Sequence, residues 1–146
     1  MKNIILLTHG EFSKGIAQSC RFILGDVPNL TALSITLDES IEQTKAMIED
    51  AWKDFDNSAP TILITDIPGG STTQSSISVL SEHPDFYLVS GLCLGMLLSL
   101  AMLELTDDRE ENLRNIRAVV EEAKDTLLLV NDVEASDTLQ DEEGEL

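Results

Sequence analysis

Four consecutive apolar residues near the start of the chain, Ile4-Ile5-Leu6-Leu7, constrain its fold more than any other stretch. A short run without alternation is typical of a strand that is buried on both faces, as in a parallel sheet covered by helices. The run ends at Thr8-His9-Gly10, and a helical pattern begins a few residues later. His9 is therefore expected just beyond the carboxyl end of the first strand, where open parallel sheets bind their ligands.

Strand and helix patterns alternate along the rest of the chain. Gly25 closes the first helical pattern, and the capping box Ser40-Ile41-Glu42-Gln43 opens the second. This order predicts an open, doubly wound, mostly parallel α/β sheet of four strands in the order 2-1-3-4, with helices on both faces. Residues 126–130 either end the last helix or form a short antiparallel fifth strand. The expected strands cover residues 4–7, 30–37, 61–66 and 86–90, and helices are expected from residues 12, 40, 96 and 108 and after residue 72. In the third helix, Ile77 and Leu80 are expected to face the sheet.

The acidic charge of the chain is large and partly local. The formal net charge is −18, which argues against nucleic acid and anionic membranes as partners. Residues 131–146 hold seven acidic and no basic side chains and show no periodicity. We therefore expect residues 1–130 to form one domain and residues 131–146 to be an acidic, disordered tail.

Neither the cysteines nor the hydropathy pattern indicates an exported or membrane-inserted protein. Cys20 and Cys93 lack the CxxC spacing of redox and zinc motifs. The longest apolar region, residues 91–105, is too short to span a bilayer, and the apolar run after Asn3 is too short for a signal peptide. We expect a cytoplasmic protein with two reduced thiols.

Polar groups follow three of the expected strands. His9 follows the first, Asp66 ends the third, and residues 91–95 follow the fourth. Because the carboxyl ends of parallel strands share one edge of a sheet, these groups are expected to converge. A carboxylate there binds one ring N–H of a histidine and leaves the other nitrogen free as a nucleophile, which makes Asp66 the candidate partner of His9.

The loop before the third helix adds a candidate anion site. Gly69-Gly70-Ser71-Thr72 places backbone N–H groups at the amino end of a helix, an arrangement that suits a phosphoryl group. Ser71 and Thr72 also carry hydroxyl donors, and either can serve as the helix cap. We therefore predict that His9 and Asp66 are catalytic and that Gly69, Gly70, Ser71 and Thr72 bind a phosphoryl group.

Other kinds of site lack the residues that they need. The motifs GxxxxGK[ST] and GxGxxG are absent, which argues against nucleotide and dinucleotide binding. A metal would need more ligands than His9, Asp66 and Cys93, so we expect neither a metal nor another cofactor. His83, in a predicted turn, is interpreted as solvated and without function. A flavodoxin-like electron carrier is an alternative from another class, although Glu11 would lie where the flavin phosphate binds.

Three motifs, taken together, resemble a known family over about residues 1 to 125. They are Ile5 to Gly10 followed by Gly15, Asp66 with Gly69-Gly70-Ser71, and Gly91 with Leu94 and Met96-Leu97-Leu98. Their residues and spacing are similar to those of the IIA domain of the mannose family of the sugar phosphotransferase system.

The resemblance implies a phosphotransferase component. His9 would accept a phosphoryl group from the phosphocarrier HPr and pass it to a histidine of a separate IIB protein, which phosphorylates sugar during uptake. Asp66 would hydrogen-bond His9, and Ser71 with the preceding glycines would hold the phosphoryl oxygens. The resemblance also implies a homodimer that exchanges a carboxyl-terminal strand, for which residues 126–130 are the candidate.

The chain departs from the family's pattern at the predicted partner-docking rim, formed by Gly10, Cys93 and Gly95. The family usually has Asn in place of Cys93 and Pro in place of Gly95, and its glycine loop usually continues Ser-Pro where this chain has Ser71-Thr72. These differences leave two alternatives open: a regulatory phosphoprotein without a sugar-transport partner, and an interaction module in which His9 is not phosphorylated.

Overall fold

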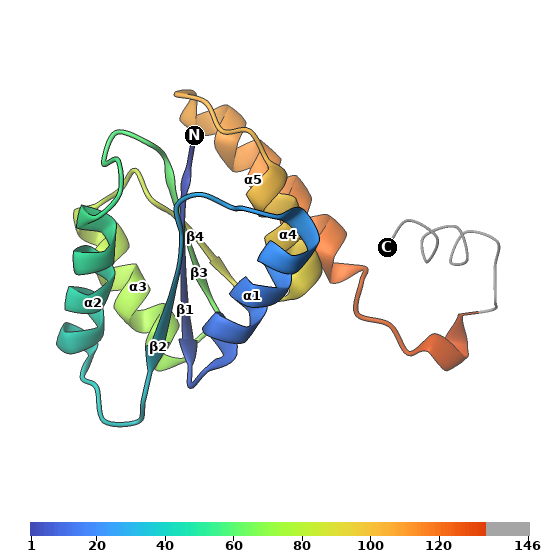
Figure 1. Ribbon diagram of the computed structural model, residues 1–146, viewed down its shortest axis with the longest axis horizontal. Helices are drawn as coiled ribbons and strands as arrows, with labels where there is room; N and C mark the ends of the chain where they lie inside the picture. The colour runs from blue at the N-terminus through green and yellow to red at the C-terminus, as the bar shows by residue number, and fades with distance from the viewer. Residues whose placement is uncertain (134–146) are drawn as a thin grey trace.

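The computed structural model describes residues 1–133, which form one parallel four-stranded sheet between two layers of helices. The strands are β1 (Asn3–His9), β2 (Leu30–Ile35), β3 (Thr61–Thr65) and β4 (Tyr87–Ser90). The helices are α1 (Phe12–Leu24), α2 (Ile41–Lys53), α3 (Ser71–Glu82), α4 (Leu94–Met102) and α5 (Arg109–Lys124). The strand order is β2-β1-β3-β4, and α2 and α3 cover the face opposite α1, α4 and α5 (Figure 1). The predicted fold class and strand order are confirmed.

Strand β1 is buried on both faces, and its side chains alternate between two cores. Ile4 and Leu6 belong to the core formed with α1, α4 and α5. Ile5 and Leu7 belong to the core formed with α2 and α3. Each such aliphatic side chain contributes about 1.5–3 kcal/mol by its burial. The uninterrupted apolar run therefore reflects a strand with no solvent-facing side.

Three helix ends lie where the sequence marks them, whereas α4 begins at Leu94, two residues before the expected start. Ser40 accepts a hydrogen bond from the backbone N–H of Gln43 at 3.1 Å, and the Gln43 side chain accepts one from the Ser40 N–H at 2.8 Å, which completes the predicted capping box. Gly25 ends α1 with a φ of 81°, a conformation that glycine adopts without strain. At the start of α5, Asp108 accepts a hydrogen bond from the Glu111 N–H.

Helix α3 agrees with the prediction at Leu80, which is partly buried against the core, and differs from it at Ile77. Ile77, expected to face the sheet, is 54% exposed. The buried side chains of α3 carry hydroxyl groups, apart from one valine: Thr72, Thr73, Ser75, Ser76 and Val79. The hydroxyls of Ser75 and Ser76 donate to carbonyls one helical turn earlier, so their burial leaves no unpaired polar group there. The expectation for Ile77 is wrong because apolar spacing alone does not reveal a helix that buries hydroxyls.

His83 ends α3 and packs against aromatic rings. Its ring centroid lies 4.8 Å from that of Trp52 and 5.2 Å from that of Phe86. The side chain is partly buried, so the expectation of a solvated His83 is wrong. The expectation failed because a local turn signal does not reveal the contact of His83 with Trp52, which lies on α2.

No fifth strand follows α5 within the described residues. Residues 126–129 are irregular, and Val130–Asp132 is a short 3-10 turn. This segment leads away from the sheet (Figure 1). Of the predicted acidic tail, residues 134–146 lie outside the part of the chain that the structure describes.

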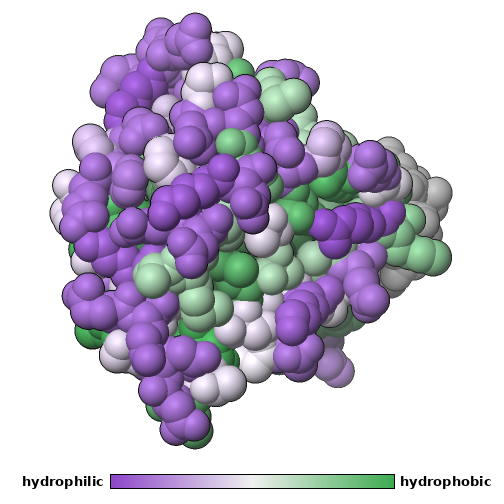
Figure 2. All heavy atoms as spheres, turned by 60° about the vertical axis from the view of Figure 1, so that its left-hand side comes forward, coloured by the Kyte–Doolittle hydropathy of each residue, from purple (hydrophilic) through white to green (hydrophobic). Residues whose placement is uncertain are grey.

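On the face shown in Figure 2, hydrophilic side chains predominate and apolar ones occur in small groups between them. Among residues 1–133, no helix has both the length and the apolar character that crossing a bilayer requires.

Replacement of Leu97 by Ala tests the core under α1 and α4. Leu97 is fully buried, so we expect its truncation to lower the free energy of unfolding by about 2–5 kcal/mol. Phe22→Ala is the control, since Phe22 is 91% exposed and its truncation should change stability by less than about 0.5 kcal/mol. Urea denaturation followed by circular dichroism measures both, and equal effects of the two substitutions would contradict this core.

Candidate functional site

His9 lies at the carboxyl end of β1, and the alternation of the strand sets its direction. Side chains two residues apart in a strand point to the same face, so His9 follows Ile5 and Leu7 toward α2 and α3. Thr8 points the other way, and its hydroxyl accepts a hydrogen bond from the Ser13 N–H at the start of α1. The His9 side chain is 37% exposed, so its ring is held by the protein on one side and open to solvent on the other.

Asp66 follows β3 and binds His9 twice through one carboxylate oxygen. Its Oδ2 accepts hydrogen bonds from Nδ1 of His9 at 2.8 Å and from the backbone N–H of His9 at 2.9 Å. Its Oδ1 accepts from the hydroxyl of Thr72 at 2.9 Å and from the N–H of Ile67 at 3.0 Å. The Asp66 side chain is only 9% exposed, and both oxygens have donors. The predicted pairing of His9 with Asp66 is present in the structure.

These contacts keep the carboxyl ionised. Burial raises the pKa of Asp66, but hydrogen bonds from the His9 backbone, the His9 ring and the Thr72 hydroxyl outweigh burial and hold the pKa below its ordinary value of 3.8. An ionised carboxylate has no proton to give, so Nδ1 of a neutral His9 is the donor. The lone pair of the neutral ring is then on Nε2, the nitrogen that faces away from Asp66.

The amino end of α3 lies beside that nitrogen. Gly69 adopts a φ of 81°, and Gly70 is the N-cap of α3. The Ser71 hydroxyl lies 3.4 Å from Nε2 of His9. A Cβ on Gly70 would lie 3.6 Å from Cε1 of His9, an ordinary van der Waals contact that shows how closely the backbone of this loop approaches the ring. The backbone N–H groups of the first helical turn have no partner within the helix, and they carry partial positive charge.

Thr72 contributes differently from Ser71. Its side chain is fully buried and its hydroxyl is engaged with Asp66. The backbone N–H of Thr72 is the group that it contributes at the helix end. The sequence placed Thr72 in the anion-binding loop. It could not show that the Thr72 hydroxyl binds the Asp66 carboxylate instead of a ligand.

Buried hydroxyls beneath the site join β3, α3 and β4. The hydroxyl of Thr65 lies 2.7 Å from that of Thr73 and donates to Ser90 at 2.8 Å. The Thr73 hydroxyl also contacts the carbonyl of Ile67 at 2.8 Å, in the loop that carries Asp66. No sequence motif indicates this network, although each member ends a strand or lies in the first turn of a helix at the predicted edge.

The loop after β2 also borders His9. Residues 35–38, with His9 and Gly10, line a shallow depression of about 540 Å³. Leu37 in this loop is 96% exposed. The predicted site included residues from the ends of the first, third and fourth strands and none from the end of the second. Since β2 is parallel to β1 and pairs with it up to His9, its end lies at the same edge.

The other predicted rim residues lie around the same edge of the sheet. Gly10 follows His9 with a φ of 60°. Cys93 is the N-cap of α4, and Gly95 is exposed in its first turn. Cys93 and Phe12 line a second depression of about 550 Å³ between the starts of α1 and α4.

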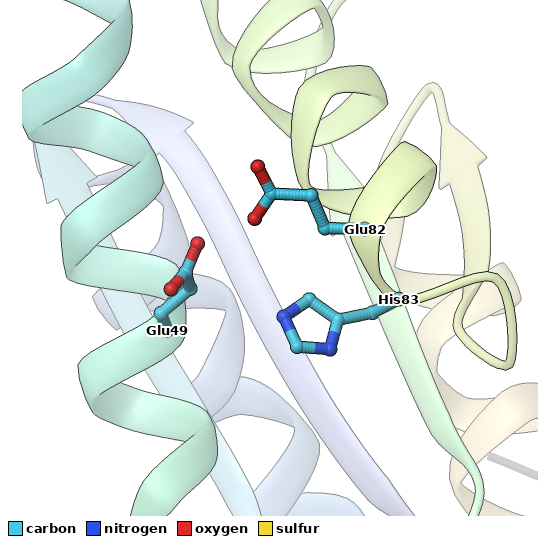
Figure 3. A group of neighbouring side chains, drawn as sticks. All are labelled: Glu49, Glu82 and His83. Atoms are coloured by element: carbon cyan, nitrogen blue, oxygen red, sulfur yellow. The ribbon is translucent and has the colours of Figure 1, made fainter.

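A separate group of potential metal ligands lies at the other end of α3. One atom each from Glu49, Glu82 and His83 lies within 4.8 Å of the others (Figure 3). Lys45 contacts both carboxylates, by a hydrogen bond to Glu82 and at 4.0 Å from Glu49. Because this ammonium supplies the positive charge that an ion would bring, we assign no metal to the group.

The fold and the site together define a class of protein. It is an open parallel α/β domain in which a half-exposed imidazole, oriented by a carboxylate, lies beside the amino end of a helix. A family model described as the PTS system fructose IIA component matches residues 3–117. The chain therefore belongs to this family of phosphotransferase-system components.

Relatives agree with this assignment. The chain is 29% identical over 99 residues to the sorbose-specific EIIA component of Lacticaseibacillus casei, covering 68% of this chain and 71% of the relative. It is 24% identical over 123 residues to the fructose-specific EIIA component of Bacillus subtilis (strain 168), covering 84% of each. A mannose/sorbose-specific IIA subunit from Enterococcus faecalis has the same fold, with a TM-score of 0.76 at 22% identity over 88% of this chain and 94% of that one. The resemblance to the mannose family is confirmed, and the flavodoxin-like alternative receives no support.

The pH dependence of the His9–Asp66 pair is a direct test of the site. We expect carbon NMR of the Asp66 carboxyl to give a titration midpoint below 3.8. The stabilisation from a carboxyl with a lowered pKa is complete above 3.8 and is lost as the pH falls through the lowered midpoint. In His9→Ala the midpoint should rise, because the ring donor is lost while the backbone donor remains. A midpoint at or above 3.8 in the unmodified chain would contradict the geometry.

Proposed function

We propose that this chain is a phosphocarrier that accepts a phosphoryl group from HPr on His9 and passes it to a histidine of a IIB protein in the cytoplasm. The observation that carries the proposal is the state of the His9 ring. Nδ1 is bound to the Asp66 carboxylate, while Nε2 is next to the amino end of α3 and the ring is 37% exposed. This is the arrangement that a histidine nucleophile needs.

The proposed transfer needs no proton movement. The lone pair of Nε2 forms a bond to phosphorus while the nitrogen–phosphorus bond of the donor breaks, and the electron pair of that bond returns to the donor histidine. Nδ1 of His9 keeps its hydrogen, so the phosphorylated ring carries a positive charge. The Asp66 carboxylate, 2.8 Å from Nδ1, balances this charge. Transfer to the IIB protein is the same kind of step, in which the acceptor histidine forms the new bond to phosphorus and His9 is the leaving group.

The amino end of α3 is the proposed binding site for the phosphoryl oxygens. The N–H groups of the loop Gly69-Gly70-Ser71-Thr72 begin the helix, and the Ser71 hydroxyl is 3.4 Å from Nε2. Helix dipole and unpaired N–H groups both favour an anion at this end. Their local positive potential is needed, because the chain as a whole carries a net charge of −18.

The rim around His9 suits a protein as the second substrate. Three large apolar side chains are exposed at this edge, Phe12 (45%), Leu37 (96%) and Ile67 (55%). The depressions beside them are shallow, and phosphoryl transfer between two proteins does not need a deep substrate cavity. We propose that Gly10, Cys93 and Gly95 belong to the docking surface, with a partner that carries basic residues opposite the acidic surface of this chain.

A second candidate function is a regulatory phosphoprotein that receives the phosphoryl group and has no sugar-transport partner. It is favoured by Cys93 and Gly95, which replace the family's usual Asn and Pro. Both lie at the start of α4, where they change the proposed docking surface and leave the His9–Asp66 pair intact.

Replacement of His9 by Ala tests the phosphorylated residue. After incubation with phosphorylated HPr, we expect the unmodified chain to gain the mass of one phosphate and His9→Ala to gain none. Intact-mass spectrometry measures the difference. The control is His83→Gln, which removes the only other histidine and should leave labelling intact. Labelled His9→Ala, or an unlabelled natural chain, would refute the proposal. Loss of the label on addition of a IIB protein separates the carrier from the regulator.

We also propose that the chain is a homodimer. Four consecutive apolar residues after α5 are exposed, Leu127 to Val130, by 92%, 49%, 63% and 62%. Strand β4 is the edge of the sheet, and beside it lies a depression of about 440 Å³ that reaches Leu127. An exposed apolar segment and an unpaired strand edge complement each other, so exchange of this segment between two copies would cover both.

The double substitution Leu128→Asp with Leu129→Asp tests the dimer. We expect sedimentation velocity to show a dimer for the natural chain and a monomer for the variant, because charges in a buried apolar segment oppose association. The control, Phe22→Asp, places a charge at an exposed apolar position on α1 and should remain dimeric. A monomeric natural chain, or an unchanged variant, would contradict the proposed exchange.

A further inference from the structure

Thr72 lies behind the His9–Asp66 pair, on the side away from the imidazole. Its hydroxyl donates to Oδ1 of Asp66 at 2.9 Å, while Oδ2 accepts both hydrogen bonds from His9. A carboxylate can only accept, so the direction of the Thr72 bond is fixed. Thr72 is the side chain that binds the oxygen His9 leaves free.

The position of that hydroxyl is set by rigid parts of the fold. Thr72 is fully buried in the first turn of α3, and its carbonyl accepts a hydrogen bond from the Ser76 hydroxyl at 2.7 Å. The next residue, Thr73, ties α3 to β3 and to the loop of Asp66 through its own hydroxyl. The Thr72 oxygen is therefore a fixed point rather than a mobile surface group.

The fixed hydroxyl limits rotation of the carboxylate. The other donor on Oδ1 is the backbone N–H of Ile67, the next residue in the chain, so it relates the carboxylate only to its own loop. Thr72 belongs to a different element, so only its bond relates the Asp66 plane to the amino end of α3. Without it, Oδ1 keeps only the donor from its own loop, and the plane of the carboxylate is less strictly fixed relative to α3.

We propose that Thr72 is a positioning residue, whose hydroxyl holds the Asp66 carboxylate in the plane that keeps Nδ1 of His9 a donor and Nε2 a nucleophile. The role extends the proposed function and rests on it for its kinetic consequence. It is a property of this chain, because the family pattern that the chain resembles usually has proline here, and proline offers no hydroxyl.

The test compares Thr72→Val with Thr72→Ser and with a matched control. Thr72→Val keeps the shape and removes the hydroxyl, whereas Thr72→Ser retains it. Thr44→Val is the control, because Thr44 is also buried and its hydroxyl donates only to a helix carbonyl, that of Ser40. We expect Thr72→Val to slow labelling by phosphorylated HPr on the order of 3- to 10-fold, the effect of one lost hydrogen bond, with Thr72→Ser and Thr44→Val near the natural rate.

Two NMR readouts on the unphosphorylated chain separate positioning from a general loss of structure. In Thr72→Val the carboxyl midpoint of Asp66 should move up, and the nitrogen shifts of His9 should show a mixture of the two neutral tautomers. Thr72→Ser should restore both signals. Thr72→Ala removes the same hydroxyl and is measured in the same way if Thr72→Val does not fold.

The outcomes distinguish this inference from the proposed function. If the natural chain is labelled and Thr72→Val matches it in rate, Asp66 midpoint and His9 tautomer, the positioning role is refuted. If the natural chain is not labelled, the proposed function fails, while the two NMR readouts still decide whether Thr72 positions Asp66. If Thr72→Ser behaves like Thr72→Val, the methyl group rather than the hydroxyl is responsible and the inference is also refuted.

Discussion

Burial of β1 on both faces is the constraint from which the site follows. With Ile4 and Leu6 in one core and Ile5 and Leu7 in the other, the strand has no freedom to slip or rotate. A shift by one residue would reverse every side chain and would place His9 on the face of α1. The direction of the imidazole is thus determined by aliphatic packing, before any polar contact forms.

With the imidazole oriented by packing, Asp66 determines which ring nitrogen of His9 carries the hydrogen. The Asp66 carboxylate is almost buried and, among residues 1–133, has no lysine or arginine paired with it. Neutral donors from three segments stabilise it: β1, its own loop and α3. Such donors favour the ionised form without neutralising it, so the negative charge stays available to a ring that becomes positive. A lysine or arginine in the same place would satisfy Asp66 equally well, but it would weaken its effect on the histidine.

The sequence was sufficient for the parts of the molecule that depend on local patterns. The apolar run of β1, the capping box at Ser40 and the glycine at the end of α1 each mark one element, and the alternation of strand and helix patterns predicted the fold class and strand order. The pairing of His9 with Asp66 followed from the shared edge of parallel strands. Local patterns do not reveal how a helix is rotated about its axis or which distant segments are in contact. This is why Ile77, His83 and the loop after β2 were misjudged or omitted.

The rotation of α3 shows which contacts decide such cases. An orientation chosen by apolar burial alone would place Ile77 inside, yet Ile77 is 54% exposed and Ser75 and Ser76 are fully buried. The two serines are satisfied within the helix, so burying them costs little, whereas Thr72 and Thr73 make bonds to Asp66 and to β3 that no other rotation allows. Because Ser75 and Ser76 follow Thr72 and Thr73 by three to four residues, about one helical turn, these four hydroxyls lie on the same face of α3. The hydroxyl contacts at the site therefore act together with the core contacts of Val79 and Leu80 in orienting α3, and this orientation leaves Ile77 exposed.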